Sequence, residues 1–89
     1  MKKIRILVKG MVQGVGYRYY CSRKADEYGI KGYVKNLFNG DVELVVEADS
    51  DLLPEFIKEL KTGPRGAYVK SVLAEDSELK DDFTDFSIY

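Results

Sequence analysis

A glycine-punctuated segment followed closely by an arginine is the part of this sequence best suited to binding an anion. Gly10, Gly14 and Gly16 precede a run with helical spacing, and Arg18 falls in the first turn of that run. A helix start presents N–H groups without partners and a partial positive charge. Glycines let the backbone turn such groups toward one point, and a guanidinium can hold two phosphate oxygens at once. The spacing is typical of a phosphate-binding loop, although the same glycines could serve only a tight turn, with Arg18 as a surface charge.

Asn36 is a second candidate, because asparagine is uncommon in strands and this one lies toward the end of a strand expected at residues 30–38. The side chain is either a turn residue, close to Asn39-Gly40, or a polar group directed at a ligand. Its residue type and position do not decide between these two interpretations.

The composition excludes several kinds of chemistry. The sequence has no histidine and one cysteine, so it lacks the Ser-His and Cys-His nucleophiles and any His-built metal site. Cys21 falls on an apolar helical stripe and is expected in the core. The carboxylates are scattered, so we expect no metal. Residue 19 is tyrosine, where a dinucleotide-binding fingerprint starting at Gly14 would need a third glycine.

Charge gives no reason to expect nucleic acid or a membrane as a partner. Lys plus Arg is 14 and Asp plus Glu is 15, a net of −1. Residues 1–45 carry a net of +5 and residues 46–89 a net of −6, which reflects either solvated faces or an anion site in the N-terminal half. The apolar run after the N-terminus is too short for a signal peptide, and no run reaches the roughly 20 residues of a membrane span. We expect a cytoplasmic protein, consistent with the single cysteine.

The hydrophobic periodicity predicts the elements that must position these residues. They are a strand in Ile4–Gly10, a helix from Tyr17 to Gly29, strands at Ile30–Phe38 and Asp41–Ala48 joined through Asn39-Gly40, a helix that Asp49-Ser50-Asp51 cap and Gly63-Pro64 end, a strand at Ala67–Ala74, an acidic loop at Glu75–Asp82 and a final strand at Phe83–Tyr89. The order is β-α-β-β-α-β with a short extra strand. It predicts an α+β, ferredoxin-like split βαβ sandwich, with an antiparallel sheet and both helices on one face. We expect one domain over residues 1–89, and a monomer.

Two segments resemble the signatures of the acylphosphatase family. Residues 10–18, Gly-Met-Val-Gln-Gly-Val-Gly-Tyr-Arg, are similar to G-x-V-Q-G-V-x-[FY]-R, and residues 32–36 with residues 40–42 resemble the second signature. Gly63-Pro64, Val69 and the closing Phe86-x-Ile88 extend the resemblance over essentially the whole chain. The departures are Ala48 at a usual glycine, Asn39 at a more frequent aspartate and Tyr17 in place of the commoner phenylalanine.

The resemblance implies an enzyme that hydrolyses acyl phosphates to a carboxylate and inorganic phosphate. It implies that Arg18 binds the phosphate and that Asn36 orients the attacking water. The backbone N–H groups of the loop would complete the phosphate site, which comprises Gln13, Gly14, Val15, Gly16, Tyr17 and Arg18. It also implies that no metal or other cofactor takes part.

Two other functions fit parts of the sequence. Residues 31–38 partly match the RNP1 octamer of RNA-binding domains of this fold. However, Lys35 stands where a stacking aromatic is needed, and the run lies on the second predicted strand rather than the third. A non-catalytic domain that binds a small anion is the other alternative. The presence of both Arg18 and Asn36 favours the enzyme over that alternative.

Overall fold

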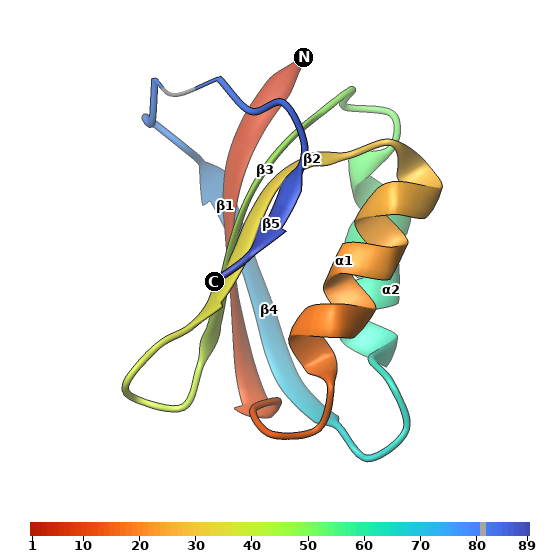
Figure 1. Cartoon of the computed structure of the whole chain (residues 1–89), viewed down its shortest axis with the longest axis vertical. Helices are drawn as coiled ribbons and strands as arrows, with labels where there is room; N and C mark the ends of the chain where they lie inside the picture. The colour runs from red at the N-terminus through yellow and green to blue at the C-terminus, as the bar shows by residue number, and fades with distance from the viewer. Residues whose placement is uncertain (81) are drawn as a thin grey trace.

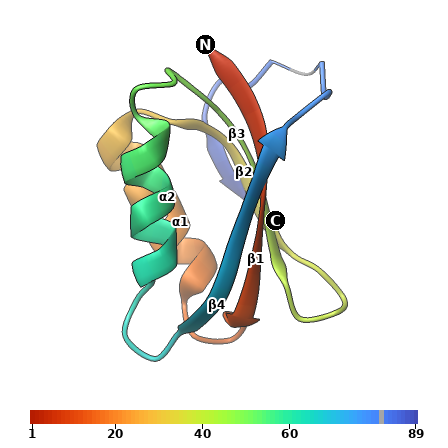
Figure 2. The same ribbon diagram turned by 180° about the vertical axis from the view of Figure 1, so that it is seen from behind.

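The fold has two helices and five strands, and the computed structural model describes residues 1–80 and 82–89 (Figure 1). The elements are β1 (Lys2–Met11), α1 (Tyr17–Tyr28), β2 (Lys31–Asn36), β3 (Val42–Ala48), α2 (Leu53–Thr62), β4 (Tyr68–Asp76) and β5 (Phe86–Ile88). Both helices cover the same face of the sheet, as the two opposite views show (Figures 1 and 2). The predicted ferredoxin-like arrangement is confirmed.

The strands form one sheet in the order β4-β1-β3-β2-β5. The pairs among β1 to β4 are antiparallel, as predicted, but β5 pairs parallel to β2. The sheet is therefore mixed, which corrects the expectation of an antiparallel sheet. The chain leaves β4 at one end of the sheet and enters β5 from the same end, so β5 runs opposite to β4 (Figure 1). Because β2 also runs opposite to β4, β5 and β2 are parallel.

The core lies between the sheet and the helices. Ile4, Ile6 and Val8 of β1 alternate inward, as the period of two predicts. Tyr17, Cys21 and Ala25 form the buried stripe of α1, and Leu53, Phe56 and Leu60 form that of α2. Gly29 follows α1 in the left-handed conformation, with φ 67°, and ends the helix as expected. These buried stripes fix the rotation of α1 and hence the directions of the side chains in its first turn.

Several predicted boundaries are wrong by a few residues. β2 ends at Asn36 rather than Phe38, and β5 begins at Phe86 rather than Phe83. β4 continues through Glu75 and Asp76, which were expected in the acidic loop, because both residues pair with β1. Backbone pairing does not depend on side-chain polarity when the side chains point to solvent.

The start of α2 also differs from the prediction. Leu52 is the N-cap and no side chain caps the helix, so Asp49, Ser50 and Asp51 do not serve as caps. The Leu52 N–H instead donates to the Asp49 carbonyl, which closes a backbone turn before the helix. Pro54 lies in the first helical turn, as expected.

Candidate active site

The loop between β1 and α1 exposes backbone N–H groups at the start of a helix. Gly14 and Gly16 both have φ 76°, in the left-handed region that glycine adopts without strain. Gly16 is the N-cap and has no side chain to cap the helix. The first helical hydrogen bond runs from the Tyr20 N–H to the Gly16 carbonyl. The N–H groups of residues 17–19 therefore have no partner within the helix, and no acidic side chain in the first turn competes for them.

A cavity of about 210 Å³ brings this loop together with the end of β2. It is lined by Val12, Gly14, Gly16, Tyr17, Arg18, Tyr19, Asn36 and Ile88. We call it the loop cavity. Arg18 and Asn36, which are 18 residues apart in the sequence, thus face one space, together with the two glycines of the loop. Gln13 and Val15 were also predicted as site residues, but they do not line it.

The Arg18 guanidinium is held by the main chain of Tyr89. Its Nη1 donates a hydrogen bond to the main-chain oxygen of Tyr89. Tyr89 is itself fixed, because its N–H donates to the Val34 carbonyl of β2 at 2.9 Å. One donor of the guanidinium is used in this way, so most of its five N–H groups remain for a ligand. The sequence alone did not predict this contact, because it links residues 71 positions apart.

Gln13 joins the loop to the β2–β3 hairpin. Its Nε2 donates to the carbonyl oxygens of Leu37 and Asp41, each at 2.8 Å. The side chain is therefore engaged by the hairpin, while the backbone stays in the loop. The sequence pointed only to the Gln13 backbone, and nothing in the residue pattern indicated the role of its amide. Val15, half-buried, packs against the core.

The hairpin shows whether Asn36 belongs to the turn. The turn is closed by the Gly40 N–H donating to the Leu37 carbonyl, and Asn39 braces it by accepting from the Asp41 N–H. Asn36 precedes the turn and is the last paired residue of β2, opposite Val42. Asn36 is therefore a strand residue and not part of the turn. It is exposed and lines the loop cavity, and its role toward a ligand stays a prediction.

Two tyrosines fix the first turn of α1 against the end of α2. The buried Tyr17 hydroxyl donates to the Leu60 carbonyl at 2.7 Å, and the Tyr20 hydroxyl donates to the Glu59 carbonyl at 3.0 Å.

Burial raises the pKa of Tyr17 far above its ordinary value, so its phenol stays protonated. Burial likewise raises the pKa of the Cys21 thiol to about 12, which leaves it inert at neutral pH.

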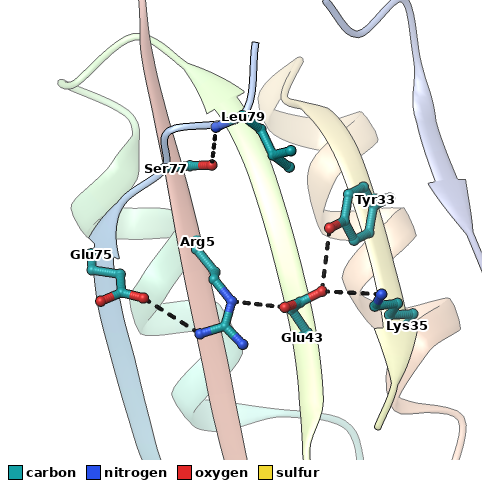
Figure 3. Close-up of polar contacts among 7 residues, drawn as sticks. All are labelled: Arg5, Tyr33, Lys35, Glu43, Glu75, Ser77 and Leu79. Atoms are coloured by element: carbon teal, nitrogen blue, oxygen red, sulfur yellow. Dashed lines mark hydrogen bonds and ion pairs between the residues drawn. The ribbon is translucent and has the colours of Figure 1, made fainter. Parts of the chain in front are cut away.

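A larger cavity, of about 620 Å³, lies on the sheet face that the helices leave open. There Arg5 Nε donates to Glu43 at 2.7 Å and Nη1 to Glu75 at 3.4 Å (Figure 3). Glu43 also receives the Tyr33 hydroxyl and lies 3.6 Å from the Lys35 ammonium. Four carboxylate residues line this cavity and its one arginine is already paired, so it is unsuited to a phosphate.

The charge of Glu43 is stabilised by that network. Burial alone would raise the pKa of Glu43, but the hydrogen bond and charge of Arg5, with smaller contributions from Lys35 and Tyr33, outweigh burial and lower it. This open-face network is therefore structural, and the loop cavity is the candidate active site.

Comparison with known proteins assigns the chain to a family. The family model described as acylphosphatase matches residues 4–88. The chain belongs to the acylphosphatase family. It is 47% identical over 87 residues to the acylphosphatase of Caldivirga maquilingensis, covering 97% of this chain and 92% of that protein. It is 43% identical to the acylphosphatase of Caldanaerobacter subterraneus subsp. tengcongensis, covering 99% and 98%. The crystal structure of acylphosphatase from Bacillus subtilis superimposes with a TM-score of 0.94 at 35% identity, covering 100% of this chain and 99% of that one.

The family gives the reaction. An acylphosphatase hydrolyses the carboxyl-phosphate anhydride of an acyl phosphate, and its products are a carboxylate and inorganic phosphate. The substrate class is thus acyl phosphates, and the enzyme is a hydrolase. In the described part of the chain, neither helix is long and apolar enough to cross a membrane.

Proposed function

We propose that the loop cavity is where this acylphosphatase binds and hydrolyses its substrate. Arg18 and the backbone N–H groups of the loop around Gly14, Gly16 and Tyr17 hold the phosphate. Asn36 holds the attacking water. The observation that carries the proposal is that Arg18, Asn36 and the loop glycines line one cavity. The uncapped start of α1 adds a partial positive charge to that cavity.

The chemistry of an acyl phosphate explains how so few groups suffice. The leaving group is a carboxylate, whose conjugate acid has a pKa of about 4. It departs at neutral pH without a general acid, so the absence of histidine is no obstacle. Phosphoryl transfer mainly needs positioning and stabilisation of charge on the equatorial oxygens. The Arg18 guanidinium and the loop N–H groups supply that stabilisation.

Asn36 supplies the position of the nucleophile. Its amide can both donate to and accept from a water molecule, and at the end of β2 it is held at one side of the cavity. An amide is too weak a base to remove the proton, so the proton of the attacking water passes to a phosphate oxygen. Holding the water in line with the breaking P–O bond is therefore its contribution to the rate.

The test is hydrolysis of benzoyl phosphate, followed by the loss of its ultraviolet absorbance, in the wild type and two matched variants. Arg18→Lys keeps the charge but loses the planar fork, so we expect kcat/KM to fall by on the order of 100-fold or more. Arg23→Lys makes the same change five residues further along α1, at an exposed residue outside the cavity, and should retain wild-type activity. Comparable activity in the two variants would reject the role of Arg18.

We further propose that residues 1–89 act as a single domain and a cytoplasmic monomer, with acyl phosphate and inorganic phosphate as its ligands and without nucleic acid, membrane or cofactor. The buried, unpaired Cys21 suits a reducing compartment, and the near balance of charges supports the lack of a polyanionic partner. Light scattering on a sizing column should give the mass of one chain, and a dimer would contradict the proposal.

A further inference from the structure

The loop cavity has to accommodate the acyl group of the substrate next to the phosphate. Its volume of about 210 Å³ is below the roughly 300–1,000 Å³ of clefts that enclose drug-sized ligands, so the acyl group stays close to the residues that line it. A side chain of that lining is therefore placed to contact the acyl group.

Two exposed aromatic residues line cavities that Asn36 also lines. Tyr19, 64% exposed, lines the loop cavity itself. Phe38, fully exposed at the tip of the β2–β3 hairpin, lines a second cavity of about 510 Å³ with Gln13, Lys35, Asn36 and Leu37. Asn36 is common to both cavities. Either ring has the area and stiffness to cover an apolar acyl group.

The geometry of phosphoryl transfer distinguishes between the two rings. The attacking and leaving oxygens lie roughly in line, on opposite sides of the phosphorus. Because the proposed function places the water at Asn36, the acyl group must leave on the side away from Asn36. Phe38 lies on the Asn36 side, since it is two residues further along the same hairpin and lines a cavity that includes Asn36 but neither Arg18 nor the loop glycines. Phe38 is thus in the wrong place for the acyl group.

Tyr19 comes from α1 rather than from the hairpin that follows Asn36. Successive helical residues are about 100° apart, so Tyr19 points roughly 200° around α1 from Tyr17. Tyr17 is directed into the core, which means that Tyr19 is directed away from the sheet that carries Asn36. Within the described part of the chain, the Tyr19 ring stacks on no other aromatic ring. The ring is therefore at the rim of the cavity and available to a ligand.

We propose that the Tyr19 ring packs against the acyl group of the substrate and makes the enzyme favour acyl phosphates with aromatic or extended apolar acyl groups over acetyl phosphate. This inference rests on the proposed function, because it uses the placement of the water at Asn36. It adds a specificity-determining residue to the groups that bind the phosphate.

The experiment compares kcat/KM for benzoyl phosphate with kcat/KM for acetyl phosphate in the wild type, Tyr19→Ala, Tyr19→Phe and Phe38→Ala. Tyr19→Ala should lower the benzoyl-to-acetyl ratio by roughly two- to tenfold, the range of one aromatic contact. Tyr19→Phe keeps the ring and should keep the ratio. Phe38→Ala is the matched control, since it removes an equally exposed ring on the Asn36 side, and it should also keep the ratio. Alanine is the best helix former, so Tyr19→Ala should fold, which circular dichroism checks.

Two results would overturn the inference. One is an unchanged ratio in Tyr19→Ala, and the other is a lowered ratio in Phe38→Ala. Its failure is distinguishable from failure of the proposed function. If the ratio does not respond to Tyr19 while Arg18→Lys still loses activity on both substrates, the acyl contact alone is wrong. If Arg18→Lys retains activity, the proposed function itself fails.

Discussion

Replacing Tyr17 by phenylalanine removes one oxygen atom from the core, and its effect on stability can be worked out from the structure. The Tyr17 hydroxyl donates a 2.7 Å hydrogen bond to the carbonyl of Leu60, a fully buried residue. Leu60 lies in the last turn of α2, where carbonyl groups have no partner within the helix. Tyr17→Phe therefore loses the bond and leaves a buried acceptor unsatisfied, which lowers the free energy of unfolding by about 1–3 kcal/mol.

The expected change is large enough to measure directly. In a domain of this size each kcal/mol shifts Tm by about 4–8 °C, so a loss near 2 kcal/mol lowers Tm by about 8–16 °C. Urea and thermal unfolding at pH 7, followed by circular dichroism, give both quantities. Phenylalanine is the commoner residue at this position of the acylphosphatase signature. Tyr17→Phe should thus lower the stability of this protein although it introduces the residue that the family usually has.

Tyr20→Phe is the matched control. Its hydroxyl donates to the Glu59 carbonyl at 3.0 Å, but the Gly63 N–H also donates to that oxygen. The acceptor stays satisfied when the tyrosine hydroxyl is removed, so the free energy of unfolding should fall by only about 0.5 kcal/mol. Equal losses in the two variants, or no loss in Tyr17→Phe, would refute the reasoning from the unsatisfied carbonyl.

The remaining predictions concern the catalytic water, pH and the sheet. Asn36→Ala should reduce kcat for benzoyl phosphate on the order of 100-fold with little change in KM, because the water is positioned for the transition state; an effect confined to KM would exclude that role. Because the sequence has no histidine, kcat should vary little across neutral pH apart from titration of the substrate, and a sharp bell near pH 7 with two different substrates would contradict this. Glu43→Gln should lower the free energy of unfolding by about 1–3 kcal/mol at pH 7. Since the pKa of Glu43 is lowered, the stabilisation from its charge is present above its ordinary pKa of 4.5 and is lost as the pH falls through the lowered value. The difference in free energy of unfolding between wild type and Glu43→Gln should therefore narrow in acid, and a constant difference would count against the ion pair. Gly32→Ala places a β-carbon 1.9 Å from the Val45 carbonyl oxygen and should cost more than about 3 kcal/mol; Gly66→Ala, also at positive φ but with nothing within 4 Å, should cost less in the same urea titration.

The buried side of the fold follows closely from the sequence. The alternation of Ile4, Ile6 and Val8 and the helical spacing of Tyr17, Cys21 and Ala25 correspond to buried positions in the structure. Periodicity is a reliable guide here because burial of apolar side chains drives the folding of each element. The hairpin at Asn39-Gly40 was also predicted correctly, because a tight turn depends only on neighbouring residues.

Contacts between segments that are distant in the sequence could not be predicted. The parallel pairing of β5 depends on which end of the sheet the chain crosses, and no local pattern encodes that route. The contact of Arg18 with the main chain of Tyr89 and the bonds of Gln13 to the hairpin join residues 71 and 24–28 positions apart. The ends of β2 and β4 were misplaced because Leu37 and Phe38 are apolar but lie in a turn, whereas Glu75 is charged but pairs with Arg5.

The position of the phosphate is the central claim, and a titration with inorganic phosphate followed by backbone and side-chain amide NMR tests it most directly. We predict that the largest shifts fall on the N–H groups of residues 14–18, on the Arg18 guanidinium and on the Asn36 side-chain amide, and that they saturate together. Shifts centred instead on Arg5, Lys35 and the open face of the sheet, with the loop before α1 unaffected, would contradict the account.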